Sequence, residues 1–205
     1  MAAARSLYAE DFRARGGKPY VIHLGADHPP LGALGYVDCA REIIEQTDAL
    51  GVKLGAVIVA SGSAASHAGV VTGLRHYGSD AMVHGICVRR TADLQHPRVL
   101  KRSRDLAGML GSPDLVQDTD VITTDAYLGE GYGKPTPGTM AAIARGAKEE
   151  TLLLDPVYSG KAFDGFLSLL NEGALPSDKA CVFIHTGGTP GLFAYAHLWE
   201  PARAS

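Results

Sequence analysis

The sequence predicts an α/β fold built on an open, mostly parallel sheet with flanking helices. Three observations predict it: short apolar runs alternate with amphipathic stretches, the run at Ala56–Ala60 is continuously hydrophobic, and turns of small residues follow the apolar runs. A continuous apolar run suits a strand that helices cover on both faces. Further strands are expected at three similar runs, Tyr20–Ile22, Ile86–Val88 and Cys181–Ile184.

Helices are expected between the strands. Thr136 and Pro137 are typical of a helix start, with an N-cap side chain followed by proline at the first helical position. Apolar residues recur at helical spacing in three stretches: Met140, Ile143, Ala144 and Ala147; Phe163, Phe166, Leu167 and Leu170; and Val37, Ala40 and Ile44. Residues 1–19 are more polar and end in Gly16–Pro19, which predicts a connector that enters the first strand.

Composition limits the range of partners. At 205 residues, the chain is long enough for one sizeable hydrophobic core. Its formal net charge of −3 gives no electrostatic reason to expect nucleic acid or an anionic membrane as a partner. No apolar stretch is long enough to cross a bilayer, and Met1–Arg5 lacks the apolar core of a signal peptide. We therefore expect a cytoplasmic protein with free thiols at Cys39, Cys87 and Cys181.

The most informative segment is Val57–Gly69, in which an apolar strand runs into a turn of small residues and then a helix. Small side chains let an anion approach the backbone, and the N–H groups of the first helical turn then point at it. The hydroxyls of Ser61, Ser63 and Ser66 add donors. Because the segment matches none of the GxxxxGKS/T, GxGxxG and GxSxG motifs, nucleotide binding, dinucleotide binding and serine hydrolysis are disfavoured. We expect a phosphate or carboxylate cradle, the alternative being a tight turn that only serves packing.

Three further loops carry glycine together with polar or aromatic side chains, and each is expected at a strand–helix junction. They are Phe183–Gly191 with Thr186, Leu154–Lys161 with Tyr158, and Asp125–Pro135 with Tyr127 and Tyr132. Because parallel strands end at one edge of a sheet, we expect these loops and the Val57–Gly69 turn to form one crevice. The eight histidines show no HExxH motif or comparable spacing, so no metal site is expected.

Five motifs in order give the sequence a family resemblance: Leu31–Tyr36 (LGALGY), Ala60–Ser63 (ASGS), Gly131–Gly133 (GYG), Asp155–Lys161 (DPVYSGK) and His185–Gly188 (HTGG). Together they resemble the D-cysteine desulfhydrase and 1-aminocyclopropane-1-carboxylate deaminase family, which are pyridoxal-phosphate enzymes of the tryptophan-synthase-β fold type. The resemblance implies that residues 20–205 are the C-terminal part of the large, cofactor-binding domain without its N-terminal strands. It also implies that residues 1–19 connect to the small domain.

The resemblance further implies roles for single residues. Thr186 would meet the pyridine nitrogen of pyridoxal 5′-phosphate with a neutral hydroxyl, which suits elimination at the β carbon of a small amino acid. Tyr158 and Tyr132 would lie near the substrate and assist proton transfer, the alternative being that both pack beneath loops. The cofactor phosphate would be bound, chiefly through backbone N–H groups, by a run of five residues: Ser61, Gly62, Ser63, Ala64 and Ala65.

Ser159 bears on the choice of reaction within the family. Deaminases of the family usually have Glu after the tyrosine, whereas the desulfhydrase branch usually has a small residue. Ser159 therefore favours conversion of D-cysteine to sulfide, pyruvate and ammonia. Asp27-His28-Pro29 is closer to the deaminase pattern, and cysteate sulfo-lyases are also similar, so both remain alternatives. Since members usually pair, the resemblance implies a homodimer.

The family's Schiff-base lysine lies early, in an Asn-Lys segment. None of the chain's lysines sits in that context: Lys18, Lys53, Lys101, Lys134, Lys148, Lys161 and Lys179. An aldehyde held in the cradle would then have no amine to react with. We therefore expect a fragment that is a poor catalyst or none in isolation. The alternatives are a non-catalytic cofactor- or anion-binding remnant and an unrelated phosphosugar-binding protein.

Overall fold

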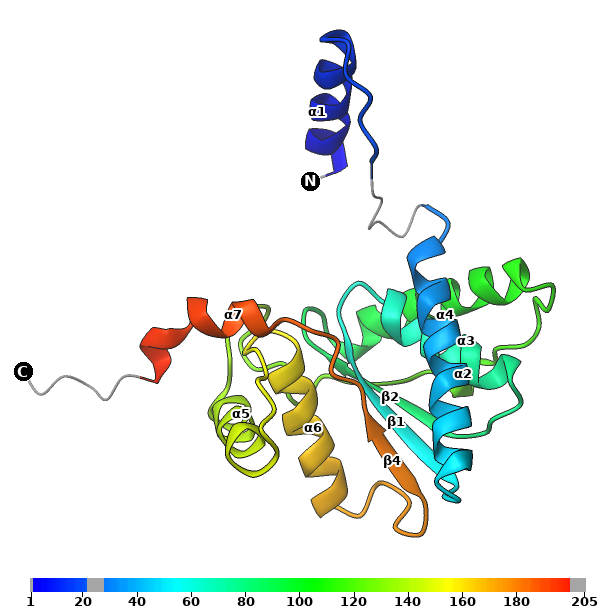
Figure 1. The fold of residues 1–205 in the computed structure, drawn as a ribbon, viewed down its shortest axis with the longest axis vertical. Coiled ribbons are helices and arrows are strands. Elements are labelled where there is room, and N and C mark those ends of the chain that lie inside the picture. The colour runs from blue at the N-terminus through cyan, green and yellow to red at the C-terminus, as the bar shows by residue number, and fades with distance from the viewer. Residues whose placement is uncertain (1, 22–27, 200–205) are drawn as a thin grey trace, which may run out of the picture.

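The computed structural model describes residues 2–21 and 28–199. In this part of the chain, four parallel strands form one sheet in the order β3-β2-β1-β4, and helices flank the sheet on both faces (Figure 1). The strands are β1 (Leu54–Ser61), β2 (Met82–Cys87), β3 (Ile122–Thr124) and β4 (Ala180–Phe183). The predicted α/β fold with an open parallel sheet is therefore confirmed, as are three of its strands.

Helices connect the strands and extend beyond them. Thr136 caps α5 as predicted, because its side-chain oxygen accepts a hydrogen bond of 3.0 Å from the Thr139 N–H. The three apolar stripes of the sequence lie in α2, α5 and α6. The helices are α1 (Ala2–Ala14), α2 (Leu34–Ala49), α3 (Ala65–His76), α4 (Ala92–Met109), α5 (Pro137–Glu150), α6 (Ser159–Asn171) and α7 (Thr189–Ala194), with short 3-10 turns at Leu31–Ala33, Asp118–Asp120 and Ala196–Leu198.

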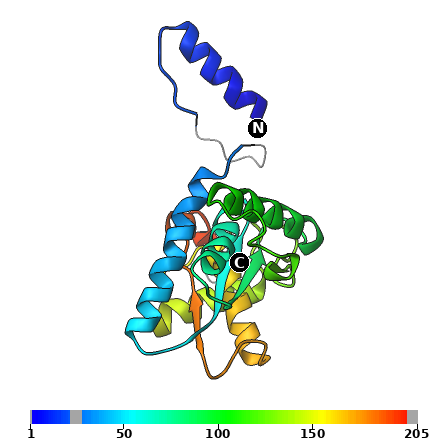
Figure 2. The ribbon, with the colours of Figure 1, turned by 90° about the vertical axis from the view of Figure 1, so that its right-hand side faces the viewer.

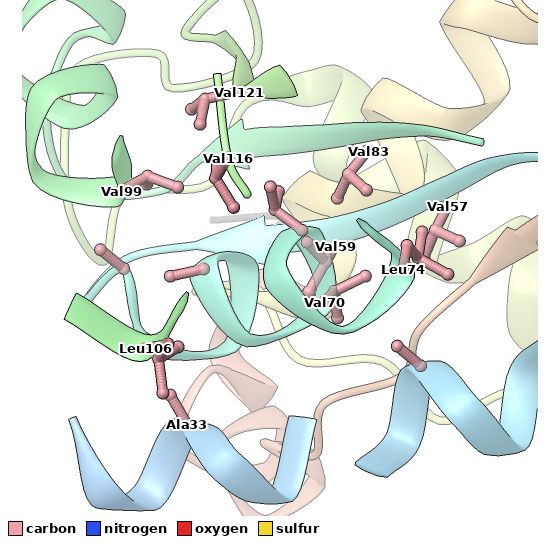
Figure 3. Close-up of a cluster of buried hydrophobic side chains, with 14 of the residues drawn as sticks. Ala33, Val57, Val59, Val70, Leu74, Val83, Val99, Leu106, Val116 and Val121 are labelled. Carbon is pink, nitrogen blue, oxygen red and sulfur yellow. The ribbon is translucent and has the colours of Figure 1, made fainter. Parts of the chain in front are cut away.

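Both faces of the sheet are buried, which explains the continuous apolar run in β1. Successive side chains of a strand point to opposite faces, so alternate residues join two different clusters. One cluster packs the sheet against α3 and α4: Val57, Val59, Val70, Leu74, Val83, Val99 and Leu106 (Figure 3). The other packs it against α6: Ala56, Ile58, Ala60, Ile86, Val88 and Ala162.

The order of the strands creates a point where the chain changes direction across the sheet. From β1 the chain moves outward to β2 and then β3, and it later returns to place β4 on the other side of β1. Ser61 of β1 pairs with Cys87 of β2, and Ile58 pairs with Phe183 of β4. The carboxyl ends of β1 and β4 therefore lie side by side, with connections that leave in opposite directions.

The strand predicted at Tyr20–Ile22 differs from the structure. Tyr20 and Val21 are not in a strand, while Ile22 lies outside the described residues, as does Asp27. Tyr20 is 91% exposed, so no burial of its side chain stabilises a strand at this position. Helix α1 lies within residues 1–19 and stands apart from the sheet in both views (Figures 1 and 2), and the expectation that these residues are a connector stays a prediction.

The loop that carries Tyr158 also differs from the prediction. It was expected after a strand, but it connects α5 to α6. These two helices pack together through Ala142, Ile143 and Phe163, with Leu154 of the loop buried between them. The loop therefore reaches the site across the α5–α6 pair. Among the described residues, no helix is both long enough and apolar enough to cross a membrane.

Candidate active site

A pocket of about 260 Å³ lies at the carboxyl ends of β1 and β4. It is the point where the strand order reverses, which is where open α/β sheets bind ligands. Ser63 follows β1 and Thr186 follows β4, so the two turns face one shared space. The lining residues are Tyr36, Ala60, Gly62, Ser63, Ser66, Tyr158, Thr186, Gly187 and Gly188.

The five candidate phosphate-binding residues of the turn after β1 have different surroundings. Gly62 and Ser63 line the pocket. Ala65 lines a neighbouring cavity of about 420 Å³, into which Ser63 also reaches. Ala64 is buried at 1% exposure and is the N-cap residue of α3, with a left-handed φ of 75°. Ser61 is equally buried and lines neither space.

The hydroxyl of Ser61 belongs to a buried polar network. Its oxygen accepts a hydrogen bond of 2.9 Å from Gln95 Nε2 and lies 3.1 Å from His67 Nδ1. His67 is fully buried, and burial lowers its pKa to about 3, so the ring is neutral and its Nδ1 shares this hydrogen bond with the Ser61 hydroxyl. The Ser61 hydroxyl thus has partners on Gln95 and His67, and its role as a donor in the cradle stays a prediction.

The ring of His67 fits beneath the sheet because β2 has a glycine at this point. A Cβ built on Gly85 would lie 2.1 Å from two atoms of the imidazole, Cε1 and Nδ1. No side chain larger than hydrogen fits in that space without moving the ring. The absence of a side chain at Gly85 thus lets His67 contact Ser61, and this buried network supports the turn after β1.

The turn after β4 is tied to the loop that follows α5. His185 Nε2 donates to the Leu153 carbonyl over 3.1 Å, and the Gly187 N–H donates to His185 Nδ1 over 3.1 Å. Each ring nitrogen therefore has a partner in the tautomer with its proton on Nε2. These bonds fix the backbone on both sides of Thr186.

Asp155 organises the loop that leads to Tyr158. Its Oδ1 accepts from the N–H and the hydroxyl of Ser159 at 2.8 and 2.7 Å, and its Oδ2 accepts from the N–H groups of Val157 and Tyr158 at 2.8 and 2.9 Å. The same carboxylate abuts Gly188, where a Cβ would lie 2.4 Å from Oδ1 and where φ is 95°. Asp155 thus joins the Tyr158 loop to the turn after β4.

Tyr158 and Tyr132 form a hydrogen-bonded pair at the edge of the pocket. Their hydroxyls are in contact, and their ring centroids are 5.7 Å apart with a T-shaped arrangement. Tyr158 lines the pocket, while the guanidinium of Arg89 lies 5.6 Å from the centre of the Tyr132 ring. Burial, followed by the hydrogen bond with Tyr132, raises the pKa of Tyr158 to about 12. Tyr158 is therefore a protonated phenol at neutral pH.

Lys161 is a buried anchor for the loop before Tyr132. Its ammonium donates to the carbonyls of Leu128 and Gly131 at 2.6 and 2.8 Å, and the residue has no exposed surface. Burial lowers the pKa of Lys161. These bonds direct the ammonium into the loop, so Lys161 holds backbone in place.

Sequence reasoning missed the side chains that support the β1 turn. Gln95 and Arg90 were not singled out, because neither belongs to a local motif and their contacts span 28 to 34 residues. The depth of Asp155 in the site was also missed, although its motif was noted. Gln95 lies four residues before Val99 on the buried face of α4, and this helical spacing is the signal that the sequence offers for it.

Comparison with known proteins settles the family. The model of the family described as "Pyridoxal-phosphate dependent enzyme" matches residues 1–187. The chain belongs to this family. It is 41% identical over 187 residues to a D-cysteine desulfhydrase of Salmonella typhi, and equally to one of Salmonella paratyphi B. In both comparisons the match covers 91% of this chain and 56% of the relative.

Solved structures of two other proteins share the fold. An ACC deaminase homologue superposes with a TM-score of 0.82 at 35% identity, covering 94% of this chain and 56% of that protein. A threonine deaminase from T.th. superposes with a TM-score of 0.57 at 20% identity, covering 89% and 59%, which supports the fold alone. The chain therefore spans a little over half the length of these relatives, and the family's cofactor is pyridoxal phosphate.

Proposed function

We propose that this chain forms the cofactor-binding part of a pyridoxal-phosphate-dependent lyase that eliminates sulfide from D-cysteine. The observation that carries the proposal is the shared pocket at the strand reversal. Ser63 after β1, Thr186 after β4 and Tyr158 before α6 all line it. Three segments that are far apart in sequence thus supply an anion-binding turn, a neutral hydroxyl and a phenol to one space.

The residues present fit the cofactor. The small residues Gly62 and Ser63 and the N-terminus of α3 would hold its phosphate, because helix N-termini offer free N–H groups to anions. The hydroxyl of Thr186 would meet its pyridine nitrogen. None of the residues that line the pocket is a lysine. In the described part of the chain, the cofactor would therefore be held by non-covalent contacts.

The phenols suit the chemistry of an elimination. When bound, pyridoxal phosphate supplies an electron sink for the negative charge that develops at the α carbon of the substrate. The raised pKa of Tyr158 keeps its proton in place at neutral pH, so this phenol would donate a proton to the departing sulfur. Tyr132 would hold the Tyr158 hydroxyl in orientation. D-cysteine and water then yield hydrogen sulfide, pyruvate and ammonia.

Ser159 supports D-cysteine as the substrate. Its hydroxyl and N–H both contact Asp155 Oδ1, and the residue is buried at 1% exposure. A glutamate at this position would place a second carboxylate beside Asp155, which is unfavourable away from water. The site therefore accommodates the small residue expected of the desulfhydrase branch. The similarity to the ACC deaminase homologue makes 1-aminocyclopropane-1-carboxylate the alternative substrate.

Two measurements test the proposal. The isolated chain is titrated with pyridoxal 5′-phosphate, and binding is followed by the cofactor's absorbance and fluorescence. We expect saturable binding without sulfide release from D-cysteine, because no lysine lines the pocket. Failure to bind the cofactor would contradict the proposed site, and rapid sulfide release by the isolated chain would contradict the expected inactivity.

The substrate is tested in a chimera. The part of the Salmonella typhi D-cysteine desulfhydrase that this chain does not match is fused in front of it, and sulfide and ammonia are measured. We expect sulfide from D-cysteine, a large loss of sulfide in Tyr158→Phe, and little change in Tyr77→Phe, which alters an exposed tyrosine at the end of α3. Ammonia from 1-aminocyclopropane-1-carboxylate, or sulfite from cysteate, without sulfide from D-cysteine would favour the alternative substrates.

A further inference from the structure

The carbonyl of Gly62 receives hydrogen bonds from two side chains outside the pocket. Arg90 donates to it over 3.0 Å, and Gln95 Nε2 donates over 3.3 Å. Both donors lie near the junction of β2 and α4, on the neighbouring strand connection. Gln95 is fully buried, and its Nε2 also donates to the hydroxyl of Ser61. The two side chains therefore hold the backbone of the β1 turn from outside the pocket.

A held carbonyl fixes the direction of the next N–H group. The peptide between Gly62 and Ser63 is trans, so its C=O and N–H point in opposite directions within one plane. Because the carbonyl points toward Arg90 and Gln95, the Ser63 N–H points away from them. Ser63 lines the pocket, and none of the described residues accepts a hydrogen bond from its N–H. This orientation leaves the N–H available to an anion.

Charge reinforces the geometry. Arg90 is partly buried, and its pKa is lowered first by burial and then by the neighbouring Arg98 and Arg89. It remains a cation at neutral pH, since arginine titrates far above that range. A cation bound to the carbonyl polarises the peptide and strengthens the Ser63 N–H as a donor. The positive charge of Arg90 beside the turn also favours a ligand with two negative charges, as a phosphate monoester has.

We propose that Arg90 and Gln95 are positioning residues for the phosphate-binding turn, acting through the Gly62–Ser63 peptide. This inference rests on the proposed function, because it assumes that the pocket receives a phosphorylated pyridine. Neither side chain lines the pocket, so neither contacts the ligand directly. Arg90 and Gln95 therefore strengthen binding of the phosphate group and leave the affinity for the pyridine ring unchanged.

The test compares two ligands that differ only in the phosphate. Pyridoxine 5′-phosphate and pyridoxine lack the aldehyde that would react with surface lysines, and their dissociation constants are measured by titration calorimetry at constant ionic strength. The variants are Arg90→Gln, Gln95→Leu and Arg90→Lys. The matched control is Arg104→Gln, on the exposed face of α4. Urea unfolding shows which variants keep the fold.

We expect Arg90→Gln and Gln95→Leu to weaken pyridoxine 5′-phosphate by about tenfold, the usual effect of losing a hydrogen bond to a charged group. Pyridoxine binding stays constant, and Arg90→Lys restores part of the loss because it keeps the cation. If both folded variants keep the wild-type ratio of the two dissociation constants, or lose both ligands equally, the positioning role is overturned. If wild type shows no preference for the phosphorylated ligand, the proposed function fails first, and this inference with it.

Discussion

The substitution Gly85→Ala tests whether the buried network under the β1 turn depends on one hydrogen atom. A methyl group at this position would lie 2.1 Å from the His67 atoms Cε1 and Nδ1, far inside van der Waals contact. His67 is fully buried, so the ring has no solvent-filled space to enter. It must therefore move away from Gly85, and this breaks its 3.1 Å contact with Ser61.

The expected cost has two parts. Forcing a methyl group into a packed interior costs about 1–3 kcal/mol. Leaving the imidazole or the Ser61 hydroxyl without a partner away from water costs about 1–3 kcal/mol more. We therefore expect Gly85→Ala to lower the free energy of unfolding by about 2–6 kcal/mol, a large share of what a domain of this size has.

Urea unfolding followed by circular dichroism measures this change. Gly108→Ala is the matched control, because nothing lies within 4 Å of its Cβ in α4, and a gain of about 0.5–1 kcal/mol is expected there. The double variant with His67→Ala should recover part of the loss, since the methyl then has room. A Gly85→Ala protein as stable as wild type, or a loss that His67→Ala does not reduce, would refute the reasoning.

Three further predictions follow from other contacts. The pKa of His67 falls from 6.5 in the unfolded chain to about 3 in the folded protein. The free energy of unfolding should therefore decline as pH drops through this range, by up to about 1.4 kcal/mol per pH unit. Urea unfolding at each pH measures this decline, and His67→Asn should flatten it. Thr151→Gly should raise the free energy of unfolding by about 1 kcal/mol in the same assay, because Thr151 ends α5 with a φ of 59°; a lower value would contradict this. Lys161→Met removes the donor to the carbonyls of Leu128 and Gly131, so it should lower the free energy of unfolding by about 2–4 kcal/mol. Proteolysis of the loop from Leu128 to Gly131 should also become faster. An unchanged rate of proteolysis would contradict the role of Lys161 in holding this loop.

Helices and strands with a clear local sequence pattern could be predicted from the sequence. The continuous run in β1 and the Thr136–Pro137 start of α5 both occur as expected. Strand β3 was missed because it has three residues, two of them threonine, and its pairing with β2 is not a local property. Helix α4 was missed because six of its 18 residues are charged and Pro97 lies inside it.

The candidate site could also be predicted only where local sequence patterns determine it. Ser63 and Thr186 were predicted to share one crevice, and they line one pocket, because parallel strands bring their ends together whatever their separation in sequence. The commitment of the Ser61 hydroxyl to His67 and Gln95 was not predictable, since three separate elements create it. Pairing of side chains across elements depends on tertiary packing, which no local pattern encodes.

The backbone of the β1 turn carries a cost that its surroundings must offset. Ala64 adopts a left-handed φ of 75°, which costs a residue with a Cβ about 1–2 kcal/mol. Such a conformation persists only where neighbours determine it: Ala64 is buried at 1% exposure, and the Gly62 carbonyl is held by Arg90 and Gln95. A turn that served packing alone would gain nothing from this arrangement. A turn that must present N–H groups to an anion gains donors already oriented before the ligand arrives, so less ordering remains to oppose binding.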